Sequence, residues 1–155
     1  MSQISNIAKI QVGDTLPPIV KQISQQRINW YAEASGDFNP IHINEDFAKK
    51  TPFGGTIAHG MLVLSFTSAL MSNVFGAEWI SRGTLSARFK AAARPGDIIT
   101  TTGTVTSIEY QNDIHCIKCS VESRNQAGEI VITGNTTVKL PSNDASNKTG
   151  IPHGQ

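Results

Sequence analysis

The segment from Gly60 to Val74 constrains the fold more than any other part of this chain of 155 residues. A helix on a protein surface shows a single apolar stripe, whereas here apolar residues fall on nearly every side of a helical circumference. The segment therefore predicts a long central helix that other elements surround. The residues that give this pattern are Met61, Leu62, Val63, Leu64, Phe66, Ala69, Leu70, Met71 and Val74.

The chain after Gly76 predicts strands, because its segments are rich in Thr, Val and Ile and are separated by Gly, Pro, Asn and Asp. Strands joined by such short turns are antiparallel. A buried helix followed by an antiparallel meander indicates an α+β domain, with a curved sheet wrapped around the helix. The predicted strands are 85–91, 98–110, 115–123 and 130–140.

Shorter elements are expected before the central helix. Ser24 can cap a helix over 25–34 that ends at Gly36. Asn44 precedes two acids and, further on, two lysines, the charge order that a helix dipole favours. The segment 12–23 suits an edge strand or an irregular lead-in.

An acid and an imidazole, Asp37 and His42, lie five residues apart on either side of Asn39-Pro40. Proline lacks an N–H and disfavours the helical conformation in the residue before it, so we expect both side chains to project from a bent loop. In such a loop they can converge on one small volume. A carboxylate and an imidazole that share a volume can hold a water molecule and exchange protons with it.

Three short segments extend this pattern: Ser35-Gly36-Asp37-Phe38-Asn39-Pro40-Ile41-His42, then Phe47-Ala48, then Ala58-His59-Gly60-Met61. Together they resemble the MaoC-like (R)-specific enoyl-CoA hydratases and dehydratases, and the similarity extends over about residues 11–141. The resemblance implies a hot-dog fold and assigns Asp37 and His42 to the binding and activation of the water that adds to an enoyl thioester. It also implies a homodimer or a higher even oligomer, with the substrate channel at the subunit interface.

Three further residues are candidates for the site. Gly60 opens the predicted helix, where unpaired N–H groups and the positive end of the helix dipole can stabilise an anionic thioester oxygen. The resemblance places the oxyanion-binding amide of the family at this glycine and a residue lining the active site at Ser68. We expect Asn39 to fix the loop through bonds to backbone groups, and His59 to have a structural role.

The expected reaction is the addition of water to a trans-2-enoyl-CoA, with the (R)-3-hydroxyacyl-CoA as the product that the resemblance implies. Asp37 is expected to accept a proton from the water and His42 to deliver one to C2, although the residues alone leave that division open. A dehydratase acting on acyl-carrier-protein substrates fits the same motif. A hot-dog thioesterase and a non-catalytic subunit that binds acyl thioesters are weaker alternatives, because the Asp37/His42 motif is complete.

Charge and composition limit the partners and cofactors that we expect for this protein. The formal net charge is +1 and no run of Lys and Arg exceeds two residues, so we expect no nucleic-acid partner. We expect a cytoplasmic protein without a membrane partner, because no signal peptide or run of 18 apolar residues is evident. Neither a phosphate-binding glycine motif nor a metal-ligand cluster appears, so we expect no cofactor or metal.

Cys116 and Cys119 form a Cys-x-x-Cys pattern, but they fall in a predicted strand, where residues three apart point to opposite faces. We therefore expect neither a redox pair nor a zinc site.

Residues 1–141 are predicted to form one domain, and 142–155 a polar, disordered tail.

Overall fold

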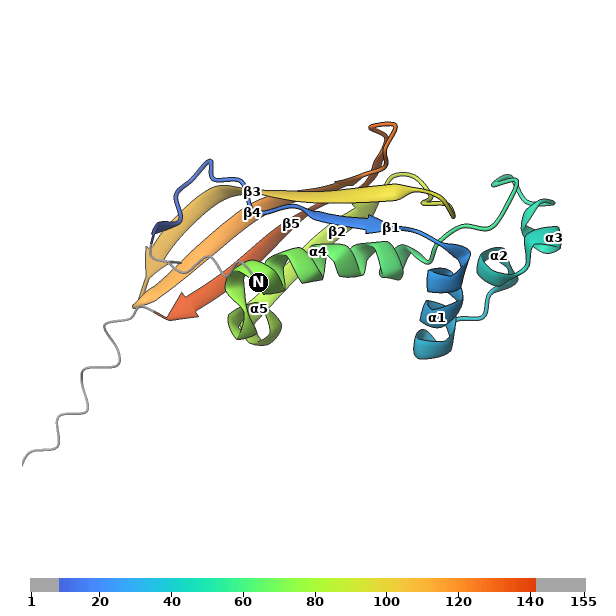
Figure 1. The fold of residues 1–155 in the computed structure, drawn as a ribbon. Coiled ribbons are helices and arrows are strands. Elements are labelled where there is room, and N and C mark those ends of the chain that lie inside the picture. Colours follow the sequence, from blue (N-terminus) through green and yellow to red (C-terminus); the bar gives the residue numbers. More distant parts are fainter. Residues whose placement is uncertain (1–8, 142–155) are drawn as a thin grey trace, which may run out of the picture.

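A long helix, α4, lies along one face of a five-stranded antiparallel sheet (Figure 1). This computed structural model describes residues 9–141. The strands follow the order β1-β3-β4-β5-β2. The elements are β1 (Ile19–Gln22), α1 (Gln25–Ser35), α2 (Pro40–Ile43), α3 (Glu45–Ala48), α4 (Gly60–Phe75), α5 (Ala77–Arg82), β2 (Gly83–Phe89), β3 (Ile98–Gln111), β4 (Ile114–Arg124) and β5 (Ile130–Pro141).

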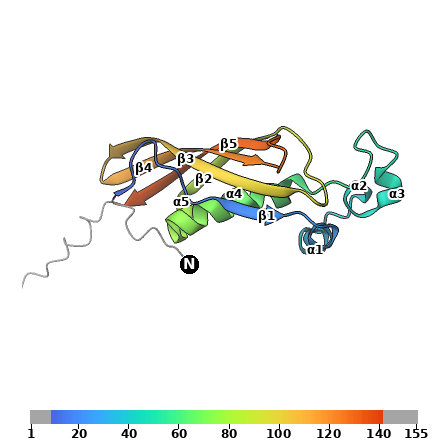
Figure 2. The same cartoon turned by 45° about the horizontal axis from the view of Figure 1, so that its top comes forward.

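The core lies between α4 and the sheet, and the predicted α+β architecture is confirmed. Near the C-terminal half of α4, Leu70 and Met71 are fully buried against residues of β3, β4 and β5 such as Val138. Near its N-terminal half, Val63 and Phe66 pack in a second cluster that includes strand residues. Figure 2 shows the same arrangement from a second direction, with the helix beneath the strands. Burial alternates along much of β3, β4 and β5, because successive side chains of a strand point to opposite faces of the sheet.

One side of α4 remains open to solvent within a single chain. Met61 is 58% exposed, and Ser65 and Asn73 are exposed on later turns of the helix. The prediction that other elements surround the helix therefore holds on the side that faces the sheet. The opposite stripe has no cover from residues 9–141.

Two short helices depart from expectation. The sequence predicted strands after Gly76, but α5 comes first; its buried Trp79 donates a hydrogen bond from Nε1 to Ser68 Oγ at 2.9 Å. His42 was expected to project from a loop, yet it lies in the single turn of α2. Pro40 explains this correction, because the first position of a helix needs no N–H and the fixed φ of proline suits it.

The ends of α1 follow the predicted capping pattern. The side chain of Ser24 accepts a hydrogen bond from the N–H of Arg27 at 3.1 Å. Gly36 terminates the helix in the left-handed region, with φ 76°, a conformation that costs other residues energy. The chain therefore turns sharply just before Asp37.

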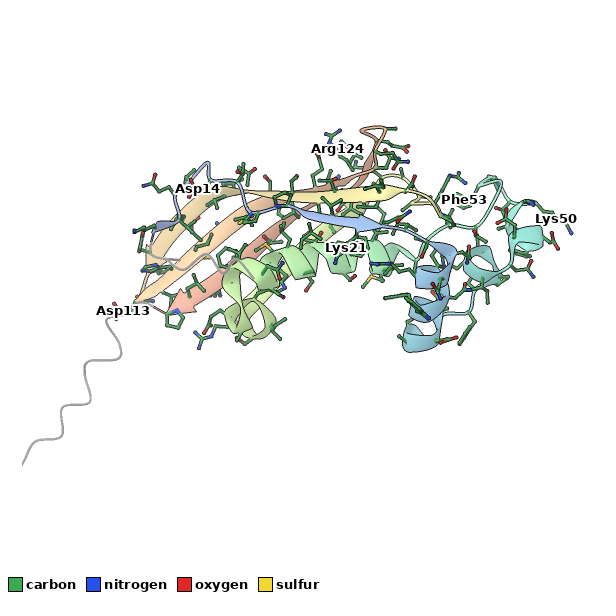
Figure 3. The ribbon with its side chains drawn as sticks, in the orientation of Figure 1. Asp14, Lys21, Lys50, Phe53, Asp113 and Arg124 are labelled. Atoms are coloured by element: carbon green, nitrogen blue, oxygen red, sulfur yellow. The ribbon has the colours of Figure 1, made fainter. Side chains whose placement is uncertain are left out.

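The loop between α3 and α4 is tied to the first helices by side chains. Thr56 donates its N–H to Glu45 Oε2 at 3.1 Å and its hydroxyl to Gln25 Oε1 at 2.7 Å. Gln25 in turn donates from Nε2 to the carbonyl oxygen of His42 at 2.8 Å. Figure 3 shows Phe53 in this loop, at the opposite end of the molecule from Asp113 in the turn between β3 and β4.

No helix within residues 9–141 is long and apolar enough to span a membrane. The tail predicted over 142–155 lies outside the described residues, so that part of the domain assignment stays a prediction.

The two cysteines differ in their environment, as the strand pattern predicted. Cys119 is fully buried in the core and Cys116 is half-buried. Burial raises the pKa of the Cys119 thiol to about 11, which leaves it protonated at neutral pH. A protonated, buried thiol is neither a nucleophile nor a metal ligand.

We expect iodoacetamide to alkylate Cys116 in the folded protein and to leave Cys119 unmodified at about pH 8. The thiolate is the reactive form, and burial suppresses both thiolate formation and access at Cys119. Peptide mass spectrometry after alkylation gives the modification at each site, and alkylation in denaturant should modify both. Equal reaction of the two cysteines in the folded protein would contradict this assignment.

The anchor of the α3–α4 loop should depend on pH. The N–H of Thr56 holds the pKa of Glu45 below its usual value. A carboxyl group with a lowered pKa contributes stability above its unfolded pKa and loses it as the pH falls through the folded value. Amide hydrogen exchange should therefore show a lower protection factor for Thr56 at about pH 3 than at about pH 7.

Glu45→Ala should lower the protection of Thr56 at both pH values. Asp46→Ala is the matched control, because it removes the neighbouring carboxylate and keeps the bond from Glu45 to Thr56. Equal protection of Thr56 in the wild type and in Glu45→Ala would show that this bond does not hold the loop.

Candidate active site

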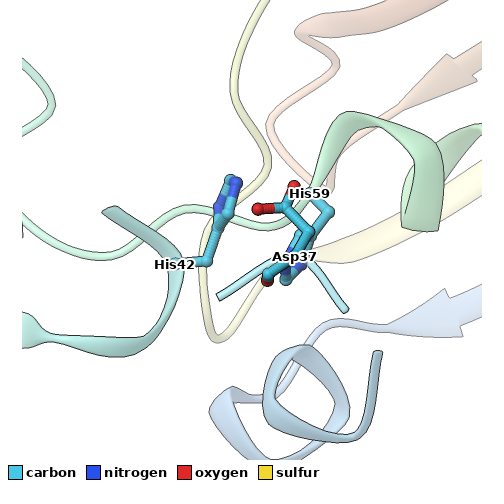
Figure 4. Close-up of side chains that lie close together, drawn as sticks. All are labelled: Asp37, His42 and His59. Carbon is cyan, nitrogen blue, oxygen red and sulfur yellow. The ribbon is translucent and has the colours of Figure 1, made fainter. Parts of the chain in front are cut away.

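Asp37, His42 and His59 come together at the N-terminal end of α4 (Figure 4). Asp37 follows the left-handed end of α1, His42 belongs to α2, and His59 is the residue before α4. One side-chain oxygen or nitrogen atom from each residue lies within 4.8 Å of the others. The predicted convergence of Asp37 and His42 is therefore present, and His59 joins them.

The imidazole of His42 is held in one tautomer by a backbone group. Its Nδ1 lies 2.8 Å from the carbonyl oxygen of Ile57. A carbonyl oxygen only accepts hydrogen bonds, so Nδ1 carries the hydrogen and Nε2 of the neutral ring keeps its lone pair. The half-buried ring thus offers a proton acceptor to the site.

The carboxylate of Asp37 is exposed and is oriented by its own loop. Its Oδ1 accepts a hydrogen bond from the N–H of Asn39 at 3.2 Å, and its own N–H donates to Ser35 Oγ at 3.2 Å. These local bonds are typical of an Asp in a turn. They leave the second carboxylate oxygen available to a ligand.

The separation between Asp37 and His42 suits a bridging water molecule. No direct hydrogen bond joins their side chains among the interactions of residues 9–141. A water molecule with hydrogen bonds of about 2.8 Å to each partner fits between atoms that lie up to 4.8 Å apart. Such a water would meet a carboxylate oxygen on one side and a ring nitrogen on the other.

Gly60 begins α4, so its N–H has no partner within the helix. A Cβ atom at this position would lie 2.9 Å from Cε1 of Phe89, a contact too short for a side chain. Glycine therefore allows the ring of Phe89 to lie against the start of the helix. Gly60 and His42 border the same cavity of about 340 Å³, whose other lining residues are Phe53, Ile57, Ala58, Val63, Phe89, Lys90, Ala91, Ala92, Ala93 and Val131.

Two other predicted residues lie in different settings. The Oδ1 atom of Asn39 accepts a hydrogen bond from the N–H of Ile41 at 3.1 Å and so caps α2, in line with the structural role expected for it. Ser68 lies two turns along α4, outside the lining of this cavity, and accepts its hydrogen bond from Trp79. A contact between Ser68 and substrate stays a prediction.

His59 is the site residue whose place sequence reasoning underestimated. It is 2% exposed, and its ring stacks on that of His42 with 3.9 Å between centroids and 30° between planes. Its Nε2 lies 2.9 Å from the carbonyl oxygen of Asp37. The available signal was a histidine placed directly before the glycine that opens the buried helix.

These three side chains also offer a set of ligands that metal ions use, but their geometry suits one ion poorly. A metal binds imidazole in the plane of the ring, through the nitrogen lone pair. The rings of His42 and His59 are stacked with only 30° between their planes, so their lone pairs do not converge on one point. The arrangement therefore fits a water held by Asp37 and His42 better than a shared metal.

Comparison with known proteins points to one family. Residues 10–127 match the model described as the MaoC like domain. An (R)-specific enoyl-CoA hydratase of Rhodospirillum rubrum is 38% identical over 128 residues, which covers 79% of this chain and 83% of that protein. A 3-hydroxybutyryl-CoA dehydratase of Methylorubrum extorquens is 36% identical over 126 residues and covers 78% of this chain and 75% of its own length.

Further similar proteins include a dehydratase named for acyl-carrier-protein substrates and several proteins of known structure. A mitochondrial 3-hydroxyacyl-[acyl-carrier-protein] dehydratase of Arabidopsis thaliana is 30% identical over 149 residues, 95% of this chain and 87% of that protein. An R-hydratase from Pseudomonas aeruginosa superposes with a TM-score of 0.76 at 26% identity, covering 87% of this chain and 84% of that one. An (R)-hydratase from A. caviae gives a TM-score of 0.74 at 29% identity, covering 86% and 98%. The capped loop with Asp37 and His42, the helix that starts at Gly60 and these matches together place the chain in the MaoC-like family of hot-dog domains.

Proposed function

We propose that this protein is a hydro-lyase that adds water across the 2,3 double bond of a trans-2-enoyl-CoA, giving the (R)-3-hydroxyacyl-CoA. The observation that carries the proposal is the approach of a side-chain atom of Asp37 and one of His42 to within 4.8 Å, next to the N-terminus of α4. Membership of a family whose relatives are named as hydratases and dehydratases supports it.

The tautomer of His42 suggests how the proton moves. Its Nε2 lone pair accepts a proton from the bound water while the water oxygen forms a bond to C3 of the substrate. Asp37 holds the second hydrogen of the water and stabilises the imidazolium that forms. The same Nε2–H then protonates C2, so that one water molecule supplies both the hydroxyl group and the hydrogen. This scheme makes His42 the proton carrier throughout; the expected alternative, in which Asp37 accepts the first proton, stays a prediction.

The thioester oxygen gains negative charge as C3 is attacked, and Gly60 is placed to stabilise it. Its unpaired N–H lies at the positive end of a helix of 16 residues and borders the same cavity as His42. The mostly apolar walls of the cavity suit an acyl chain or the arm of the carrier. Lys90, also at this cavity, can meet a phosphate of the carrier.

The dehydratase reaction on acyl-carrier-protein substrates is the second candidate. It runs the same bond changes in reverse, and a relative that covers 95% of this chain is named for it. Comparing kcat/KM for matched CoA and carrier-protein thioesters separates the two, and a ratio above about tenfold identifies the preferred carrier.

Crotonyl-CoA provides the first test of the proposed reaction. Hydration removes the absorbance of the conjugated enoyl thioester, whereas a thioesterase would release a free thiol and a binding subunit would do neither. We expect loss of absorbance without thiol release. Thiol release at a comparable rate would favour the thioesterase alternative.

We also propose that the protein forms a homodimer or a higher even oligomer. The outer edge of β2 has no strand partner within residues 9–141, and unpaired edges of this kind promote association. Large apolar side chains are exposed nearby, including Phe89 (54%) on β2 and Ile80 (73%) on α5. Together with the open stripe of α4, these surfaces suit a second copy related by a twofold axis.

Asp37→Asn and His42→Gln should each lower kcat by about 10²–10⁴, the usual scale for a positioned acid or base. The double variant should lose less than the product of the two effects, because both residues act on one water molecule. Asp46→Asn and His115→Gln are matched controls, since they change the same residue types outside the site. Near-normal turnover by either Asp37→Asn or His42→Gln would contradict the assignment.

Dilution of the enzyme should lower its specific activity in parallel with dissociation of the oligomer. The open stripe of α4 and the start of that helix lie close to the proposed interface, so loss of the partner should disturb the site. Sedimentation equilibrium gives the dissociation constant, and assays with an inert carrier protein exclude losses by adsorption. A stable monomer that retains full specific activity would refute the shared interface.

A further inference from the structure

We propose that His59 is the positioning residue of the site and that it sets the separation between Asp37 and His42. It contacts both members of the pair from outside their own segment: its Nε2 donates to the backbone carbonyl of Asp37, and its ring face lies against the ring of His42. The inference rests on the proposed function and adds a third residue to its machinery.

The bond from His59 to Asp37 fixes an otherwise exposed turn. Within residues 9–141, the other hydrogen bonds of Asp37 go to Ser35 and Asn39, which belong to the same turn. Among the hydrogen bonds of these described residues, the one from His59 alone connects Asp37 to the buried start of α4. Loss of this donor would remove the bond that holds the turn to the start of α4.

The protonation state of His59 follows from its two ring nitrogens. Nε2 faces a carbonyl oxygen and must therefore carry a hydrogen. Nδ1 is buried and finds no hydrogen-bond partner among residues 9–141. A hydrogen on Nδ1 would create a charged ring with an unsatisfied buried donor, which is costly, so His59 is neutral with its hydrogen on Nε2.

A neutral ring in this place suits the proton cycle of His42. The two imidazoles are stacked at 3.9 Å, so a positive charge on His59 would oppose the charge that His42 acquires during turnover. Tyr31 lies against His59 with 4.9 Å between ring centroids and helps to keep the ring in its plane. His59 thus keeps Asp37 and His42 in position without exchanging protons itself.

Two substitutions test the positioning role. His59→Leu removes the donor and the ring, and we expect kcat to fall about 100-fold with KM within about twofold, because small misplacements of reacting groups have effects of this size. His59→Gln keeps an amide nitrogen at the same number of bonds from Cα as Nε2, so it should recover about tenfold of that loss. His115→Leu is the matched control on β4, and rates are referred to folded protein measured by circular dichroism.

A purely structural role would lower the folded fraction and leave kcat per folded molecule unchanged in both variants, which would overturn the proposal. A rise in KM at constant kcat, or no recovery in His59→Gln, would overturn it as well.

A spectroscopic measurement tests the same proposal on the wild-type protein and does not require enzymatic activity. In wild-type protein labelled with ¹⁵N-histidine, we expect His59 to carry its hydrogen on Nε2 and His42 to carry its hydrogen on Nδ1 at about pH 7. A hydrogen on Nδ1 of His59, or a charged His59 ring, would overturn the proposal. If the protein hydrates no enoyl thioester, the proposed function is wrong. The tautomers of His42 and His59 would still show whether His59 donates its hydrogen bond to Asp37.

Discussion

The packing of α4 against the sheet fixes where that helix begins, and the candidate site depends on this one position. Leu70 and Met71 are fully buried between the helix and the strands. Truncating either to alanine costs about 2–5 kcal/mol, a large share of the roughly 5–15 kcal/mol that stabilises a domain. A helix held this firmly cannot slide along its axis, so His59 and Gly60 have defined places.

The remaining site residues are brought to this fixed point by backbone and side-chain hydrogen bonds. Ile57 and Asp37 each offer a carbonyl oxygen to one histidine, and these two bonds select opposite tautomers for His42 and His59. Gln25 connects the backbone of His42 to Thr56. The site is therefore assembled from the start of α1, the segment 37–42 and the segment 56–60, and hydrogen bonds connect these three parts.

Local signals predicted much of this structure. The cap at Ser24, the left-handed turn at Gly36 and the buried helix from Gly60 were all readable, because each depends on neighbouring residues. The motif around Asp37 and His42 identified the family before any contact was known. The contacts of His59 were not predictable from the sequence, because they join it to residues 17 and 22 positions away. The helix α5 was also missed, since burial of Trp79 against α4 decides its conformation.

Ile57 contributes to the site in two ways. Its carbonyl oxygen selects the tautomer of His42, and the residue also borders the cavity beside Gly60. Every amino acid has the same carbonyl group, so the proton chemistry does not depend on the identity of residue 57. The shape of the cavity wall does depend on it. Substrate preference can therefore diverge at this position among related enzymes while the reaction that they catalyse stays the same.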